Sequence, residues 1–130
     1  MKTYSFQNLG VWQESKTIVV FIYELTKTYP KDEMYGLSSQ MRRAAISVCS
    51  NIAEGAGRQT KKNQAQFYTI AYGSLMELLN QLLISVDLKY LSQEQLNNKF
   101  LPLINNVSLM LYKLKQYWFN FRIKNNEFKS

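Results

Sequence analysis

Apolar side chains recur every three to four residues along most of this chain, the spacing of one face of an α-helix. Residues that break helices are rare, since the 130 residues include only five glycines and two prolines. So few breakers favour a few long helices over many short strands. A chain of this length can also bury a hydrophobic core as one domain without a disulfide or a metal. The sequence therefore predicts an all-α protein.

Four segments carry the helical pattern, at about 9–29, 38–55, 60–87 and 92–117. Local signals suggest where they begin and end. Asn8 and Ser38 are expected to cap the first and second helices, because their side chains can accept hydrogen bonds from free backbone N–H groups. Pro30 is expected to stop the first helix, and Gly55 to end the second in a left-handed cap.

The later helices carry further signals. Gly73 lies mid-helix, where glycine is unfavourable, so we expect close backbone approach to the second helix there. Ser92 and Gln95 have the spacing of a capping box at the start of the fourth helix. Pro102 predicts a kink in that helix or its division into two shorter ones.

Short connections between these helices predict an antiparallel up-down-up-down four-helix bundle. We assign residues 1–120 to the bundle domain and residues 121–130 to a basic and aromatic C-terminal tail. The aromatic run that begins near Tyr117 leaves two possibilities open. It continues the fourth helix and packs against a neighbouring subunit, or it folds back on the same chain.

The charge of the chain is positive and uneven. Sixteen Lys and Arg against nine Asp and Glu give a net charge of +7. Residues 38–62 carry five basic side chains and one acidic, and residues 99–130 carry six and one. This pattern favours an anionic partner, with an ordinary solvated basic surface as the alternative.

Cysteine content and hydropathy bear on the compartment. The single Cys49 cannot form an internal disulfide, and the N-terminus has no apolar signal segment. The longest apolar run is far shorter than the roughly 20 residues that span a bilayer. These features predict a cytoplasmic protein with no membrane association.

The segment 37–58 combines small residues with two adjacent arginines, Arg42 and Arg43. Guanidinium groups pair well with phosphates, so these two are candidate nucleic-acid contacts. The candidate set is completed by the residues that follow the helix: Arg58, Lys61 and Lys62. Adjacent residues lie about 100° apart on a helix. We therefore expect one of the two arginines to face outward and the other to form a structural ion pair with Glu54 or Glu77, inside the bundle or across a subunit interface.

Catalytic and metal chemistry have little support in the sequence. The chain has no histidine, so the Glu-x-x-His pairs of di-metal bundles are missing, and the usual acid–base and nucleophilic sets are absent. We expect no enzymatic activity, no metal and no cofactor.

Several of these residues together resemble a known family. The matching positions are Phe6, Leu9, Val11-Trp12-Gln13, Tyr29-Pro30, Glu33, Tyr35-Gly36-Leu37, Gln40, Arg42-Arg43-Ala44, Ser50-Asn51-Ile52-Ala53-Glu54-Gly55, Arg58, Ala71, Gly73-Ser74 and Glu77. In that order they resemble the four-helix bundle proteins encoded in 23S rRNA intervening sequences, over about residues 6–117. That family is related to the accessory variability determinant of diversity-generating retroelements. Asn8 and Cys49 depart from its pattern, which often has an acidic residue and a proline there.

The resemblance implies a bundle that assembles into a homo-oligomeric ring, with a homopentamer as the precedent. It also implies a basic surface for nucleic acid and, in the retroelement branch, a reverse transcriptase partner. We therefore expect a non-enzymatic oligomer that binds RNA or DNA. The alternative is a structural adaptor that docks a protein such as a reverse transcriptase.

Overall fold

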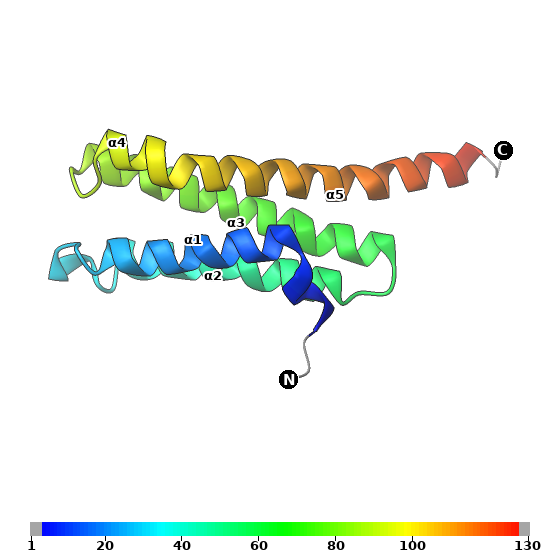
Figure 1. Ribbon diagram of the computed structural model, residues 1–130, viewed down its shortest axis with the longest axis horizontal. Helices are drawn as coiled ribbons and strands as arrows, with labels where there is room; N and C mark the ends of the chain where they lie inside the picture. Colours follow the sequence, from blue (N-terminus) through cyan, green and yellow to red (C-terminus); the bar gives the residue numbers. More distant parts are fainter. Residues whose placement is uncertain (1–3, 128–130) are drawn as a thin grey trace.

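The computed structural model describes residues 4–127, which form four long helices, short helical turns and no strand (Figure 1). The elements are a 3₁₀ turn at Ser5–Asn8, α1 at Gly10–Thr26, a 3₁₀ turn at Lys31–Glu33, α2 at Leu37–Ala56, α3 at Lys61–Asp87, α4 at Gln93–Gln95, a π turn at Leu96–Phe100 and α5 at Leu101–Glu127. Successive long helices run in opposite directions, and α5 lies beside both α1 and α3. The predicted all-α, four-helix architecture is confirmed.

The core is one continuous cluster of buried side chains between the helices. Every long helix contributes to it at three- and four-residue spacing, as the sequence pattern predicts. The largest fully buried side chains are Ile18, Ile22, Met41, Ile52, Leu75, Leu78, Leu82, Leu96, Phe100, Ile104 and Leu111. Burying each such side chain stabilises the fold by about 1.5–3 kcal/mol.

A close contact between α2 and α3 lies near the end of α2, at Gly55. A Cβ atom at this position would lie 2.8 Å from Cε1 of Tyr68 and 3.0 Å from Cβ of Phe67, both on α3. Gly55 is still helical, and the described glycines all have negative φ angles, so the predicted left-handed cap is wrong. The close approach expected at Gly73 is also wrong, because a Cβ there would meet nothing within 4 Å. Gly55 is the residue that lets α3 pack tightly against α2.

Of the three predicted N-terminal caps, one is present and two are not. Ser92 forms the predicted capping box with Gln95. Thr60, for which no cap was predicted, caps α3 by accepting the Asn63 N–H at 3.1 Å. Ser38 does not cap α2, since it is buried inside that helix, which begins one residue earlier. Asn8 belongs to the first 3₁₀ turn, so Leu9 occupies the N-cap position of α1 and makes no side-chain cap bond.

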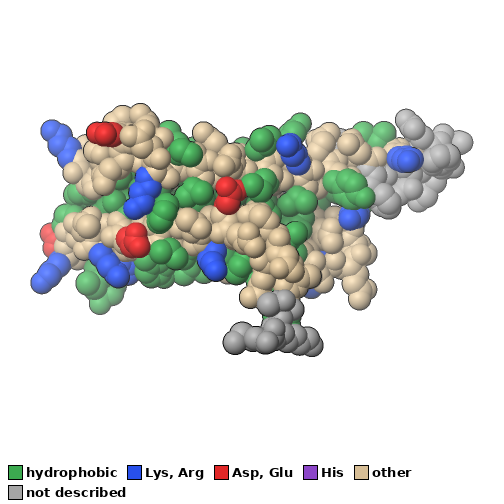
Figure 2. Space-filling model, in the orientation of Figure 1, with side chains coloured by type: hydrophobic (Ala, Val, Ile, Leu, Met, Phe, Trp, Pro, Cys, Tyr) green, Lys and Arg blue, Asp and Glu red, His purple; other side chains and the backbone are tan. Residues whose placement is uncertain are grey.

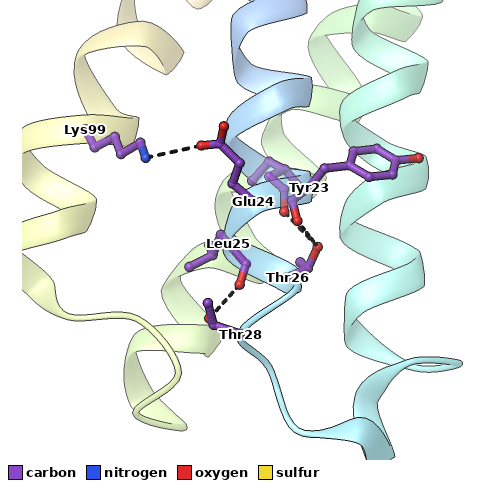
Figure 3. Close-up of polar contacts among 7 residues, drawn as sticks. Tyr23, Glu24, Leu25, Thr26, Thr28 and Lys99 are labelled. Atoms are coloured by element: carbon purple, nitrogen blue, oxygen red, sulfur yellow. Dashed lines mark hydrogen bonds and ion pairs between the residues drawn. The ribbon is translucent and has the colours of Figure 1, made fainter.

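Helix α1 ends at Thr26, four residues before Pro30, and Figure 3 shows the hydroxyls around this end. Thr26 Oγ1 donates to the Ile22 carbonyl at 2.7 Å, and Thr28 Oγ1 donates to the Leu25 carbonyl at 2.6 Å. Such hydroxyls compete for helical carbonyls and favour the tight turn that follows. Helical-type backbone bonds continue to Tyr29, whose N–H bonds to the Thr26 carbonyl, so the chain leaves the helical path directly before Pro30, where the sequence predicts the stop.

Pro102 is accommodated by a change of helix type. The Leu101 N–H bonds to the Leu96 carbonyl, five residues back, so the turn Leu96–Phe100 is π-helical. Proline has no backbone N–H to donate, and the wider π turn before Pro102 accommodates this missing donor. The predicted interruption is therefore present, as a short α4, a π turn and a long α5.

Helix α5 continues beyond the other helices at its C-terminal end (Figure 1). The segment that begins at Tyr117 continues the helix and does not fold back on the chain. The domain boundary at residue 120 stays a prediction, and residues 128–130 of the predicted tail lie outside the described part of the chain. None of the described helices is long and apolar enough to cross a membrane.

The two helical glycines give a matched test of this packing. Gly55→Ala adds a methyl group against a buried tyrosine, and overpacking of this kind costs roughly 1–3 kcal/mol. Alanine recovers about 1 kcal/mol through its helix propensity, so we expect a net loss of up to about 2 kcal/mol in urea unfolding. Gly73→Ala has open space around it and should gain about 0.5–1 kcal/mol. If Gly55→Ala stabilised the protein as much as Gly73→Ala, the close-packing account would be wrong.

Candidate nucleic-acid interface

The five predicted basic contacts fall into two groups. Arg42 and Arg43 lie in the first half of α2, whereas Arg58, Lys61 and Lys62 lie at the connection between α2 and α3. From Arg42 to the end of α2 at Ala56 is 14 residue steps, about 21 Å along the axis, and Arg58 lies two residues beyond that end. The two groups therefore do not form one patch within the chain.

Arg42 holds α1 and α2 together. Its Nε donates to Thr26 Oγ1 at 2.8 Å, and its guanidinium lies 4.5 Å from the centre of the Tyr23 ring. Figure 3 shows that this ring extends from α1 toward the neighbouring helix. Arg43 is exposed, which leaves Arg42 as the inward residue of the pair. The partners of Arg42 within the chain are thus a hydroxyl and an aromatic ring, not the Glu54 or Glu77 that the sequence favoured.

Glu54 lies near a different arginine. Arg58 Nη2 is 3.9 Å from Glu54 Oε2, and both side chains are about half exposed. The Arg58 guanidinium also lies 4.6 Å from the centre of the Phe67 ring. A surface pair of this kind contributes little to stability, but it offsets part of the charge of Arg58. Arg58 is therefore less available to an anion than the two lysines that follow it.

Glu77 makes no ion pair with any Lys or Arg that the structure describes. Its Oε1 accepts a hydrogen bond of 3.4 Å from Gln81 Nε2, one turn further along α3. The structural ion pair predicted for this residue is therefore absent within the described chain.

Lys61 and Lys62 occupy the first turn of α3, which contains no acidic residue. The positive end of the helix dipole makes this an unfavourable place for cations, by about 0.3–1 kcal/mol each. Lys61 Nζ lies 4.4 Å from the centre of the Tyr117 ring on α5. The positive charge of this turn and the N-terminal backbone N–H groups of α3 are both suited to an anion.

A groove between α3 and α5 begins beside these lysines. Its volume is about 960 Å³, and its lining includes the cations Lys62, Lys115 and Arg122 together with Ile70 and Trp118. No Asp or Glu is among the described residues that line it. The structure thus brings a cation from the start of α3 together with two from the second half of α5.

Sequence reasoning missed Lys115 and Arg122 as members of this site. Two signals point to them: the excess of basic residues in 99–130, and their seven-residue spacing, which puts both on one face of a helix. Their partner helix could not be inferred from that spacing. On the face shown in Figure 2, Lys and Arg side chains are spread along the whole bundle, whereas no acidic side chain is seen near the C-terminal end of α5.

Two observations concern the cysteine and possible metal ligands. Burial raises the pKa of the Cys49 thiol, so the thiolate that a nucleophile needs is disfavoured. Among the residues described, no three His, Cys, Asp or Glu side chains gather in a way that could hold a metal ion. The groove can instead bind through charge and apolar contact.

Comparisons with known proteins agree with the fold. A crystal structure of a protein of unknown function from the S23 ribosomal protein family of Bacteroides thetaiotaomicron superposes with a TM-score of 0.60 at 18% identity, and covers 85% of this chain and 96% of the other. A search of curated proteins finds no match. The family model described as 23S rRNA-intervening sequence protein matches residues 7–113. The chain therefore belongs to the 23S rRNA-intervening sequence protein family.

Proposed function

We propose that this protein is a non-enzymatic, homo-oligomeric bundle that binds RNA or DNA by contacts to the phosphate backbone. One observation carries the proposal: Lys62, Lys115 and Arg122 converge from two helices on a groove with no acidic residue among its described lining. Side chains that are far apart in sequence supply like charges to one place. Like charges repel one another, so their convergence is best explained by an anionic partner.

The chemistry of these groups suits phosphates. Lysine and arginine bind phosphate oxygens and release the counterions that surround a nucleic acid, which makes the affinity depend on salt. The first turn of α3 adds free backbone N–H groups and the positive end of the helix dipole, and both favour an anion at this N-terminus. Contacts of this kind position a polynucleotide without reading its sequence.

The family description refers to an intervening sequence of 23S rRNA. A link to RNA is consistent with the proposal. Arg42 has no part in it, because its side chain is engaged between α1 and α2. Arg43 is exposed, but it lies on α2, and the groove is formed by α3 and α5.

Assembly into a homo-oligomer is part of the proposal. Leu83, Ile84 and Leu88 are 40–48% exposed near the C-terminal end of α3, the end of the bundle opposite the groove. Subunits that met there would leave the basic grooves accessible. Light scattering is expected to give a multiple of 15.3 kDa, with five subunits favoured by the family resemblance. A mass of one subunit at micromolar concentration would contradict this part of the proposal.

A pair of charge reversals tests the site. Lys62→Glu with Lys115→Glu should weaken the binding of a generic RNA at least tenfold, because two phosphate contacts are lost. Each lost contact should also reduce the slope of log K against log salt concentration by about 0.7–0.9. The matched control is Lys31→Glu with Lys113→Glu. It makes the same change in net charge at exposed positions outside the groove, one of them on α5 itself. Fluorescence anisotropy at several salt concentrations measures both quantities.

Equal losses in the two double variants would show that only net charge matters and would exclude the groove as the site. Affinity for RNA that ignored salt would contradict binding by phosphate contacts. Binding of a cellular protein that survives nuclease treatment, with no affinity for RNA or DNA, would favour the adaptor alternative such as a reverse transcriptase partner.

A further inference from the structure

The groove between α3 and α5 is longer than its basic part. A second hollow of about 460 Å³ lies along the same two helices, and Lys115 lines both hollows. The second hollow is lined by aromatic and polar side chains: Tyr72 from α3, and Asn105, Ser108 and Tyr112 from α5. The two hollows therefore adjoin at Lys115, and we refer to them together as the path along α3 and α5.

A single stripe of α5 lines this path. Its members follow at three- and four-residue steps: Asn105, Ser108, Tyr112, Lys115, Trp118 and Arg122. The stripe spans 17 residue steps, or about 25 Å of helix. Aromatic and cationic side chains alternate along its second half.

Aromatic rings and cations also lie close together at this surface. Lys115 Nζ is 5.1 Å from the centre of the Tyr72 ring, and Lys61 Nζ is 4.4 Å from the centre of the Tyr117 ring. Tyr112 and Tyr117 are each 59% exposed, so their rings remain accessible to a ligand. No Asp or Glu appears in the described lining of either hollow.

We propose that the ligand of this path is a single-stranded polynucleotide whose bases stack on the exposed aromatic rings, an inference that rests on the proposed function. Phosphates meet Lys62, Lys115 and Arg122, and an unpaired base stacks on Tyr112. A single strand can use both kinds of group, because its base faces are free. A duplex hides its base faces within the stack and can use only the cations. The alternation of rings and charges is the juxtaposition that distinguishes the two ligands.

Tyr112 provides the test. Loss of one stacking partner weakens the binding of a single strand by about tenfold, so Tyr112→Ala should raise the Kd for an oligo(U) of about 15 nucleotides by that factor. Tyr112→Phe keeps the ring and should bind like the wild type. Tyr35→Ala removes a tyrosine that is 93% exposed in the connection between α1 and α2, and it should also leave the Kd unchanged. Circular dichroism and light scattering confirm that each variant keeps its fold and assembly.

The same variants are measured with three probes: the oligo(U), an oligo(dT) of the same length and a mixed-sequence duplex. Stacking is common to RNA and DNA, so Tyr112→Ala should weaken both single strands and change duplex binding less than about twofold. A wild type that binds the single strands more tightly than the duplex supports the inference. The ratio of the affinities for oligo(U) and oligo(dT) then shows whether RNA or DNA is the preferred ligand.

Two results would overturn the inference while the proposed function stands. One is equal affinity for duplex and single strands. The other is a Tyr112→Ala variant that binds oligo(U) like the wild type, while Lys62→Glu with Lys115→Glu does not bind it. Failure of the wild type to bind any of the three probes would instead overturn the proposed function itself.

Discussion

The close approach of α3 to α2 at Gly55 is the constraint on which the basic end of the bundle depends. A side chain at this position would collide with Tyr68, so the two helices meet at short range only because the residue is glycine. The connection between them is only four residues long. It therefore places the first turn of α3, and with it Lys61 and Lys62, close to the contact at Gly55. A packing requirement in the core thus places charges at the surface.

The second half of the site depends on how the chain passes Pro102. A π turn contains one residue more than an α turn, so it rotates the helix that follows by about 100°. The phase of α5 is set there, and it determines which side chains face α3. In this phase the stripe that contains Tyr112, Lys115 and Arg122 lines the groove. A residue that the sequence marks only as a helix breaker therefore helps to orient the candidate site.

Most of the fold was predictable because its signals are local. Apolar periodicity located the helices, and the capping box at Ser92 located the start of α4, which leads through the π turn into α5. Apart from the caps expected at Asn8 and Ser38, the failures concern interactions between segments. The role of Gly55 depends on a tyrosine in the next helix, and the partner of Arg42 is a threonine at the end of α1. For the same reason, Lys62 could be proposed from the sequence, whereas its convergence with Lys115 required the arrangement of α3 and α5.

We propose that the groove between α3 and α5, and not the basic character of the whole surface, binds nucleic acid. Acetylation of the lysines of the wild-type protein, with and without saturating oligo(U), tests this proposal without any substitution. Mass spectrometry measures the extent of reaction at each lysine. The account predicts that Lys61, Lys62 and Lys115 react more slowly when the oligonucleotide is bound. Exposed lysines outside the groove, Lys27, Lys31 and Lys113, should react at unchanged rates. Equal protection of both groups, or protection of Lys27 and Lys31 alone, would contradict the account.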